Sequence, residues 1–353
     1  MSSEFWLAEA RFDWATYVRE HGGVRAVHGR SDEYLLQCPA CGKAKLAVNV
    51  SKRAWRCFTC AVGGKDAASL VAQVEAVPWH HSLARVMGSG ARAPIGALDR
   101  LVAELDPSER SAPASWKERV WPEGWRPLGP IFAAQAQGYP VAMDPSLEVP
   151  ARAAAYVASR RIPSYVVDAM RLGVCVEGPF RARVVFPCFD AGGRLVFFQG
   201  RATWPPHPRE LRHIKTLSPR SEDGYAGPSD CLLNLGWVAD RIEEFEHRVL
   251  IVEGPIDCAH AWPDAVATWG KKISPRQIEI LVRAGVRAVD LCWDADAASD
   301  MARIAPVLCD LFEVRIVDLP EGRDPGDLTK EEIELHRARA RRMGSGDRLE
   351  RLT

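Results

Sequence analysis

The sequence predicts a multidomain α+β protein, and three observations support this prediction. Two pairs of cysteines lie near the start of the chain, Cys38 with Cys41 and Cys57 with Cys60, as in a small metal-bound ribbon. From residue 248 to residue 317, apolar runs alternate with helical stretches, which indicates a parallel α/β unit. The length of 353 residues favours about two or three domains.

We expect the first domain over residues 1–87, with one structural Zn²⁺ held by the four cysteines. Fifteen residues separate Cys41 from Cys57, a spacing that suits one tetrahedral ion between two turns. The residues between the pairs, 47–56, indicate two strands joined by a polar turn. The ion would hold this sheet together, because so few residues bury little apolar area.

Basic and aromatic residues interleave along the same ribbon. This composition is typical of a surface that binds single-stranded nucleic acid. A purely structural ribbon is the alternative. The residues concerned are Lys43, Lys45, Lys52, Arg53, Trp55, Arg56 and Phe58.

The second part of the chain is expected to be a linker followed by a basic region. Residues 88–150 are rich in Gly, Ala and Pro, and we interpret them as a partly ordered linker. Regular patterning returns at residue 151 and defines a basic part over residues 151–240. Two strands joined by a Gly-Gly turn are predicted there, with Arg183 and Arg201 near the ends of the hairpin.

The α/β unit is expected over residues 241–328, and it contains the predicted catalytic metal site. Glu253 and Asp294 each follow a predicted strand, and Asp296 comes two residues later. In parallel sheets, ligands bind at the carboxyl ends of the strands. Three converging carboxylates would repel one another unless cations neutralise them, and Mg²⁺ or Mn²⁺ suits that role. The predicted strands are 248–252, 265–268, 287–293 and 313–317, and the predicted helices are 255–261, 274–284 and 298–310.

The last segment, residues 329–353, is predicted to be a basic helix and tail. Thr329 and Glu332 form a capping box that opens the helix. The helix is expected to continue through Arg341 and Arg342. We therefore expect truncation after Lys330 to leave the catalytic part intact.

The charge is unevenly distributed along the chain. The formal net charge is zero, with 46 basic and 46 acidic side chains. Residues 151–220 hold twelve basic and four acidic residues, whereas residues 240–330 hold eleven basic and eighteen acidic residues. This arrangement suits phosphate binding beside metal chelation. Charge alone supports equally well two solvated surfaces of different composition.

Several protein classes are excluded by the composition. No run of about 18 apolar residues is present, so no membrane span or membrane partner is expected. The first residues lack the basic start of a signal peptide. Ten cysteines without such a signal favour a reducing, cytoplasmic compartment. The cysteines outside the two pairs are expected to be small buried apolar residues.

These motifs together resemble the bacterial-type (DnaG-like) DNA primases. The two cysteine pairs, followed by Gly63-Gly64 and Asp66, resemble the zinc domain of that family. Residues 154–162 and the 183–201 hairpin resemble the start of its RNA-polymerase domain. Glu253-Gly-Pro-Ile-Asp257 is similar to the metal-binding motif of its Toprim domain. The resemblance covers residues about 30–87 and 151–328, and the compact motifs favour a phage or plasmid origin.

The resemblance implies an enzyme that synthesises RNA primers on single-stranded DNA by metal-dependent nucleotidyl transfer. Glu253, Asp294 and Asp296 would be the catalytic residues and the magnesium or manganese ligands, with Asp257 and Asp324 as further candidate ligands. One departure is Gly326, where many members carry a second acid. The implied partners are a DNA template, NTPs and a replicative helicase acting in trans, in the host cytoplasm if the gene is phage-borne. The implied nucleotide- or template-binding residues are Arg183, Arg201, Lys215 and Lys271.

Two other functions remain open from the sequence. A Toprim nuclease would use the same acids for hydrolysis, but it would not need the 183–201 hairpin or the zinc ribbon. A non-catalytic single-stranded DNA-binding protein could keep both modules. It would not need the metal-binding carboxylates, so other residues could replace them. A type IA topoisomerase is excluded, because it needs a nucleophilic tyrosine in a large additional domain.

Overall fold

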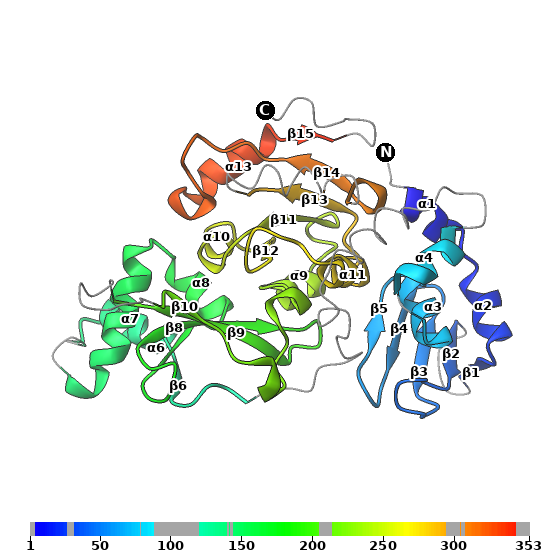
Figure 1. The fold of residues 1–353 in the computed structure, drawn as a ribbon, viewed down its shortest axis with the longest axis horizontal. Helices are drawn as coiled ribbons and strands as arrows, with labels where there is room; N and C mark the ends of the chain where they lie inside the picture. Colours follow the sequence, from blue (N-terminus) through cyan, green and yellow to red (C-terminus); the bar gives the residue numbers. More distant parts are fainter. Residues whose placement is uncertain are drawn as a thin grey trace.

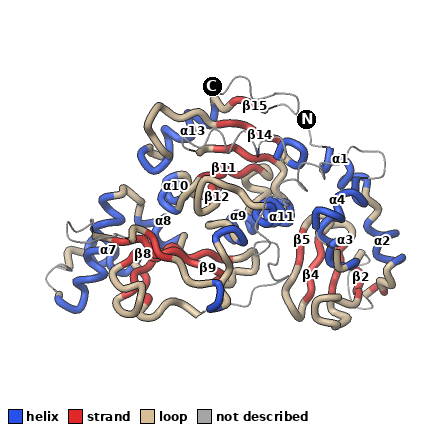
Figure 2. The backbone as a smooth tube through the Cα atoms, viewed as in Figure 1, coloured by secondary structure: helices blue, strands red, loops and turns tan. Residues whose placement is uncertain are grey.

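The structure, a computed structural model, contains three five-stranded sheets with their own helices (Figure 1). It describes residues 4–26, 32–77, 79–87, 120–139, 141, 144–204, 214–293, 304 and 308–343. The sheets follow one another in chain order, and Figure 2 shows helices beside each of them. The predicted multidomain α+β class is confirmed.

The first sheet and its helices form the N-terminal module, residues 4–87. Its strands are antiparallel and lie in sequence order. Val48 pairs with Trp55 in register, which confirms the predicted strand, turn and strand. Trp14, Trp55 and Leu70 are buried between the sheet and the helices. The elements are α1 (Glu4–Arg11), α2 (Trp14–Glu20), β1 (Val24–Arg25), β2 (Glu33–Leu36), β3 (Leu46–Asn49), β4 (Ala54–Cys57), β5 (Gly63–Gly64), α3 (Ala67–Glu75) and α4 (Trp79–Met87).

The second sheet, called here the middle sheet, is antiparallel with the order β10-β9-β8-β7-β6. The predicted hairpin is confirmed as β8 (Arg183–Phe189) and β9 (Leu195–Ala202). Its turn is closed by Asp190, whose Oδ1 accepts hydrogen bonds from the N–H groups of Gly192 and Arg194. The other strands are β6 (Trp125–Pro127), β7 (Gly173–Cys175) and β10 (Thr216–Leu217). The helices are α6 (Gly129–Ala136), η3 (Pro145–Leu147), α7 (Glu148–Ser159), α8 (Ser164–Ala169), η4 (Ser221–Asp223), η5 (Pro228–Asp230) and α9 (Leu235–Asp240).

The predicted linker is wrong for the part of it that the structure describes. Residues 88–119 lie outside the described residues. In the rest, β6 pairs with β7 at the edge of the middle sheet, and α6, η3 and the start of α7 follow. The prolines that suggested a linker stand where proline is compatible with regular structure. Pro127 ends an edge strand, and Pro130 and Pro145 lie in the first turn of α6 and η3.

The third sheet confirms the predicted α/β unit. The order is β12-β11-β13-β14-β15, in which the first four strands are parallel and β15 is antiparallel. Ser274 caps α11 as predicted, accepting a hydrogen bond from the N–H of Gln277. Of the predicted helix 298–310, residues 308–310 are helical, and most of the others lie outside the described residues. The elements are β11 (Arg248–Val252), α10 (Pro255–His260), β12 (Ala265–Ala267), α11 (Pro275–Arg283), β13 (Ala288–Leu291), β14 (Glu313–Ile316), η7 (Pro325–Asp327), α13 (Lys330–Ala338) and β15 (Arg341–Arg342).

The C-terminal segment is part of this unit, which corrects the sequence prediction. Thr329 caps α13 as expected, but the helix ends at Ala338 and the chain then pairs with β14 as β15. Ile333 is fully buried, and Arg337 forms ion pairs with Asp264 and Asp290 at 2.6 and 2.7 Å. Truncation after Lys330 would therefore remove core and ion-pair partners of the α/β unit. Residues 344–353 lie outside the described residues.

The three sheets pack through shared apolar clusters. One cluster includes side chains of the N-terminal module and of the α/β unit, and a second includes side chains of the middle sheet and of the α/β unit. The N–H of Lys65 also donates to the carbonyl oxygen of Arg283 in α11 at 3.1 Å. The N-terminal module is thus docked against α11. Among the described residues, no helix combines the length and apolar character needed to cross a bilayer.

Candidate metal centre and catalytic cavity

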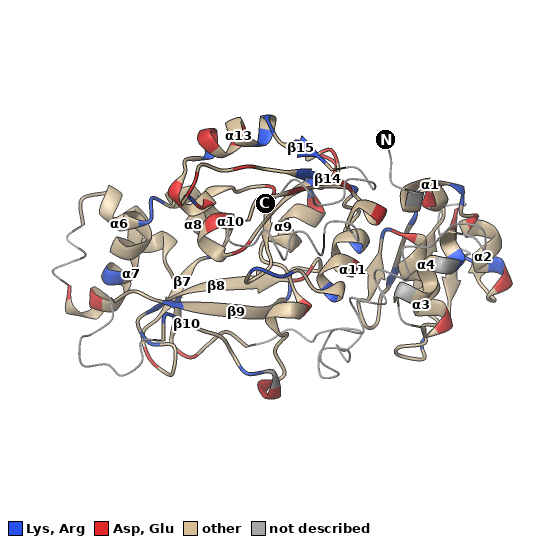
Figure 3. Cartoon of the chain, turned by 45° about the horizontal axis from the view of Figure 1, so that its top comes forward, with Lys and Arg blue, Asp and Glu red and all other residues tan. Residues whose placement is uncertain are grey.

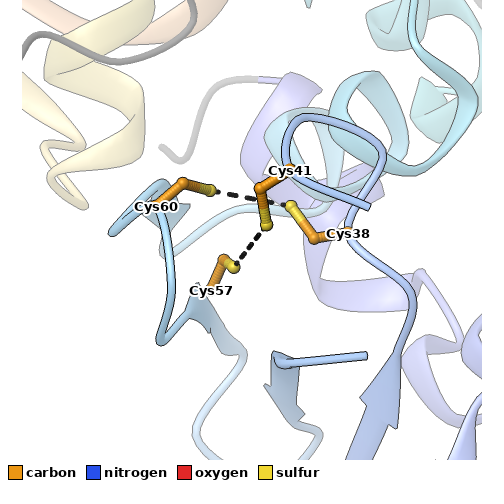
Figure 4. A group of neighbouring side chains, drawn as sticks. All are labelled: Cys38, Cys41, Cys57 and Cys60. Atoms are coloured by element: carbon orange, nitrogen blue, oxygen red, sulfur yellow. Dashed lines mark hydrogen bonds between the residues drawn. The ribbon is translucent and has the colours of Figure 1, made fainter. Parts of the chain in front are cut away.

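The structure brings the four predicted zinc ligands together at the end of the first sheet (Figure 4). Their sulfur atoms all lie within 4.8 Å of one another, and none is in a disulfide. The Sγ atoms of Cys38 and Cys60 are 3.7 Å apart, and those of Cys41 and Cys57 are 3.6 Å apart. A tetrahedral Zn²⁺ with bonds of about 2.3 Å has sulfur–sulfur edges of about 3.8 Å. The arrangement therefore fits a four-cysteine zinc site.

The thiols of this cluster differ in how readily they ionise. Burial raises the pKa of the Cys38 thiol. Burial acts to raise the pKa of Cys57 as well, but the N–H groups of Cys60 and Thr59 point at its sulfur and lower its pKa below the usual value. Thiolates are the form that binds metal, so these amides favour the binding form of Cys57.

A cavity of about 390 Å³ lies between the middle sheet and the α/β unit. It collects residues that are far apart in the sequence. The cations lie directly after α7, on β9 and directly before β10, and the acids lie in α10 and in the segments after β11 and β14. Five of the predicted site residues line it, namely Arg201, Lys215, Glu253, Asp257 and Asp324. Because it collects predicted site residues, we call this candidate active site the catalytic cavity. Its remaining lining residues include Arg160, Gln199, Thr216, Trp269, Gly270, Gly326 and Asp327.

Glu253 lies at the carboxyl edge of the parallel sheet, where the sequence placed it. It follows β11, which lies between β12 and β13. Ile251 of β11 is in register with Leu291 of β13, so both strands leave the sheet at the same edge. Asp294 and Asp296 lie outside the described residues, and Trp293 is the last residue described before them. Their role as ligands stays a prediction.

Asp257 connects two loops of the cavity wall. Its Oδ2 accepts a hydrogen bond from the N–H of Gly254 at 3.0 Å, and its Oδ1 accepts one from the N–H of Gly326 at 3.1 Å. The loop that carries Glu253 is thereby bound to the loop that carries Asp324. A side chain at position 326 would place its Cβ only 3.0 Å from Asp257 Oδ1. A larger residue here would require Asp257 to shift by a few tenths of an ångström.

The opposite wall of the catalytic cavity is cationic. Arg201 and Thr216 pair across β9 and β10, which places the neighbouring Lys215 beside Arg201. The guanidinium of Arg201 lowers the pKa of Lys215, and burial and Arg160 act in the same direction, whereas Asp324 raises it. Cations this close to one another are stabilised by a bound anion such as a polyphosphate.

Sequence reasoning missed Arg160 as a site residue. It stands directly after the last residue of α7, and from there it lines the catalytic cavity. The available signal was a pair of arginines near the end of residues 154–162, the segment that resembles the start of the primase RNA-polymerase domain. That signal is weak, because basic residues are common at helix C-termini for reasons of helix stability alone.

Two predicted nucleotide-binding residues do not line this cavity. Arg183 is buried, donates to the carbonyl oxygen of Ile214 at 3.0 Å and lies over the ring of Trp204. Burial also lowers the pKa of its guanidinium. It therefore supports the segment that leads to Lys215. Lys271 follows Gly270, which does line the cavity, but Lys271 itself is not among the lining residues.

A second cavity, of about 550 Å³, separates the N-terminal module from the middle sheet. On the module side it is lined by Arg56 and by Phe58, whose side chain is 70% exposed. Phe189 and Arg194 line the side of the middle sheet. Exposed aromatic rings beside arginines are typical of surfaces that stack and hold single-stranded nucleic acid.

A buried ion-pair cluster lies in the α/β unit, away from both cavities. Asp290 on β13 has no exposed surface, and it forms ion pairs with Arg248, Arg315 and Arg337 at 2.6–2.9 Å. Figure 3 shows acidic and basic segments on α13 and near β14 and β15, the elements that surround it. Burial opposes ionisation of Asp290, but hydrogen bonds from Arg315 and Arg337 lower its pKa below the usual value.

The fold and the sites define a class: multidomain α+β proteins in which a four-cysteine module precedes a parallel sheet with carboxylates at its carboxyl edge. No family model matches the chain. In sequence it is homologous to bacterial DNA primases over somewhat less than half of its length. It is 31% identical to a DNA primase of Deinococcus radiodurans over 173 residues, which is 45% of this chain and 29% of that protein. With a DNA primase of Escherichia coli the identity is 32% over 163 residues, 43% of this chain and 26% of the other.

The chain thus spans less than a third of the length of the curated relatives it matches. Solved structures similar to it include the zinc-binding and RNA polymerase domains of the Aquifex aeolicus primase. That similarity has a TM-score of 0.46 and 20% identity, and covers 97% of this chain and 87% of the other.

Proposed function

We propose that this chain is a DNA primase that joins ribonucleotides on a single-stranded DNA template by metal-dependent nucleotidyl transfer. The observation that supports this most is the catalytic cavity, in which Arg160, Arg201 and Lys215 face Glu253 and the loop of Asp324. A triphosphate needs cations, and the metals that accompany it need carboxylates. The sequence similarity to bacterial DNA primases points to the same activity.

In this proposal the chain contributes binding and orientation. Arg160, Arg201 and Lys215 hold the phosphates of the incoming NTP on one side of the catalytic cavity. Glu253, together with Asp294 and Asp296, would hold Mg²⁺ or Mn²⁺ on the other side. Bound metal would lower the pKa of the attacking 3′-hydroxyl and stabilise the departing pyrophosphate. Asp257 acts here by holding two loops together, because both of its oxygens accept backbone N–H groups.

We propose a separate role for the N-terminal module in holding the template. One structural Zn²⁺ would bind the four cysteines, and Phe58 and Arg56 would contact unpaired bases and phosphates in the second cavity. The proposed domain limits are residues 4–87 for this module, about 120–240 for the part built on the middle sheet and 241–343 for the α/β unit. A replicative helicase as partner and a phage or plasmid origin remain predictions.

The proposal is tested by incubating the protein with single-stranded DNA, labelled NTPs and Mg²⁺ or Mn²⁺. We expect short RNA products that depend on the template. A Toprim nuclease would instead cleave labelled DNA in the absence of NTPs, and a binding protein would do neither. Either of those results would contradict the proposal.

Arg160→Ala tests the cationic wall of the catalytic cavity. We expect the KM for NTP to rise about tenfold or more, because a charge-assisted contact to phosphate is lost. The matched control is Arg152→Ala in α7, the helix that Arg160 directly follows. Arg152 is half exposed and pairs with Glu148 at the surface, so its loss should leave the KM unchanged.

A further inference from the structure

His260 is a buried histidine with backbone carbonyls on both sides of its ring. It is the last residue of α10, and 8% of its surface is exposed. Its Nδ1 lies 2.7 Å from the carbonyl oxygen of Leu328, and its Nε2 lies 2.7 Å from that of Arg160. None of the roles proposed above uses this residue.

The two contacts are both hydrogen bonds only if each ring nitrogen carries a proton. A carbonyl oxygen can only accept a hydrogen bond, and a neutral imidazole carries a single N–H. Only the imidazolium ion, which carries two, can donate to both carbonyls. A neutral ring would turn a nitrogen lone pair toward a carbonyl oxygen at 2.7 Å, which is repulsive.

One of the two carbonyls lies at the end of a helix. Arg160 directly follows α7, a helix of 12 residues. The carbonyls at a helix C-terminus lack intrahelical partners and carry partial negative charge. A hydrogen-bond donor at this position therefore satisfies a carbonyl that the helix leaves without a partner.

The ring connects the two walls of the catalytic cavity. Arg160 belongs to the cationic wall, and Leu328 directly follows η7, whose loop carries Asp324. A second bond joins the same elements, because Arg161 donates to the carbonyl oxygen of Asp327 at 2.8 Å. His260 therefore contacts both the end of the helix that presents a phosphate-binding arginine and the end of the loop that presents an acid.

We propose that His260 is a positioning residue, an imidazolium that holds the end of α7 against the end of η7 and so sets Arg160 across the cavity from Asp324, which opens η7. The consequence for nucleoside triphosphate binding rests on the proposed function. The protonation of the ring and its two hydrogen bonds do not.

The first test measures the ring itself by nitrogen NMR, on the full chain labelled with ¹⁵N-histidine at near-neutral pH. The signals of His260 are assigned as those that disappear in His260→Gln. We expect both ring nitrogens to carry a proton. His247 serves as an internal comparison, because its Nδ1 contacts one carbonyl oxygen, that of Gly285 at 2.9 Å, and one N–H satisfies that contact. A non-protonated ring nitrogen in His260 would overturn the proposal.

The second test measures the consequence for the substrate. His260→Leu removes both donors, and we expect the KM for NTP to rise about tenfold or more with a smaller change in kcat, because Arg160 is displaced. His260→Gln keeps two N–H donors on one nitrogen and should recover most of the loss. The control His336→Leu makes the same substitution on α13 and should leave the KM unchanged.

The outcomes separate the two proposals. A folded His260→Leu variant with the wild-type KM would overturn the positioning role. If that variant does not fold, the NMR measurement on the wild-type chain decides. If the wild-type chain makes no RNA at all, the proposed function fails, and the protonation of His260 is still tested.

Discussion

The N-terminal module and the α/β unit are held together by different means. In the module, four thiols gather within 4.8 Å of one another at the end of a sheet of short strands. In the α/β unit, the carboxylate of Asp290 lies under three arginines from β11, β14 and α13. The first arrangement would be completed by a bound metal ion, whereas the second already contains both signs of charge. We therefore expect the folding of the module to depend on bound metal. We expect the stability of the α/β unit to depend on the ion pairs of Asp290 and on pH.

The largest expected effect is the loss of metal from the module. Cys57→Ser should abolish stoichiometric zinc binding and unfold the ribbon, because binding contributes on the order of 10 kcal/mol to such folds. The α/β unit should stay folded. Metal analysis and a thermal melt measure both effects. Cys309→Ser is the control, since Cys309 lies outside the cluster. Wild-type protein without zinc would contradict the assignment.

The second effect concerns the buried ion pairs. Asp290→Asn should destabilise the α/β unit by about 3–5 kcal/mol, because three arginines lose a buried carboxylate. Denaturant unfolding measures the change, and zinc content should not alter. Asp318→Asn is the matched control: Asp318 pairs with Arg341 but is 60% exposed, so its loss should cost less than about 1 kcal/mol. Equal effects of the two variants would contradict a special role for Asp290.

Low pH should also weaken the ion pairs of Asp290 and so destabilise the α/β unit. Although burial opposes it, the arginines lower the pKa of Asp290 in the folded state. The carboxylate therefore contributes its full stability at pH values above the pKa that Asp290 has in the unfolded chain. That contribution is lost as the pH falls through the lowered value. The Asp290→Asn variant should lack this part of the acid dependence.

A smaller pH effect is expected where α1 meets α3, and there stability should fall, not rise, with increasing pH. Glu9 accepts a hydrogen bond from the N–H of Ala67, but burial and the nearby Asp66 raise its pKa from 4.5 to about 7. The folded state binds this proton more tightly than the unfolded state, so stability falls as the pH rises from 4.5 to about 7. The loss is at most about 3 kcal/mol.

Glu9→Gln should remove this pH dependence and stabilise the protein at neutral pH. The amide can still accept from Ala67, and it removes a charge beside the Asp66 carboxylate. Unfolding free energies measured from mildly acidic to neutral pH give the result. Glu20→Gln, at an exposed position on α2, is the control. A variant with the wild-type pH slope would refute the role of Glu9.

The same two regions show what the sequence could and could not predict. The cysteine cluster was predictable, because its four ligands occupy two short motifs with a characteristic spacing. The strands of the α/β unit were predictable as well, since buried parallel strands are continuous apolar runs. The cluster around Asp290 was not, because Arg315 and Arg337 follow it by 25 and 47 residues. No local pattern indicates which arginine a buried acid will contact.

The catalytic cavity was predicted in part for the same reason. Glu253 could be placed because strand ends meet at one edge of a parallel sheet. Arg160 and His260 could not, since their roles depend on where α7 meets η7, a contact between residues more than a hundred positions apart. The prolines of residues 120–150 misled the prediction because proline is compatible with an edge strand and with a first helical turn as well as with a linker.

In the proposed function, the carboxylates at the edge of the parallel sheet hold the metal for RNA synthesis. The most direct measurement compares template-dependent RNA synthesis by the wild-type chain, Glu253→Gln and Asp294→Asn over a range of Mg²⁺ concentrations, with zinc content and thermal stability recorded for each. We expect both variants to fold and keep zinc, and to lose synthesis by about 100-fold or more. Synthesis near the wild-type rate by either folded variant would contradict the claim.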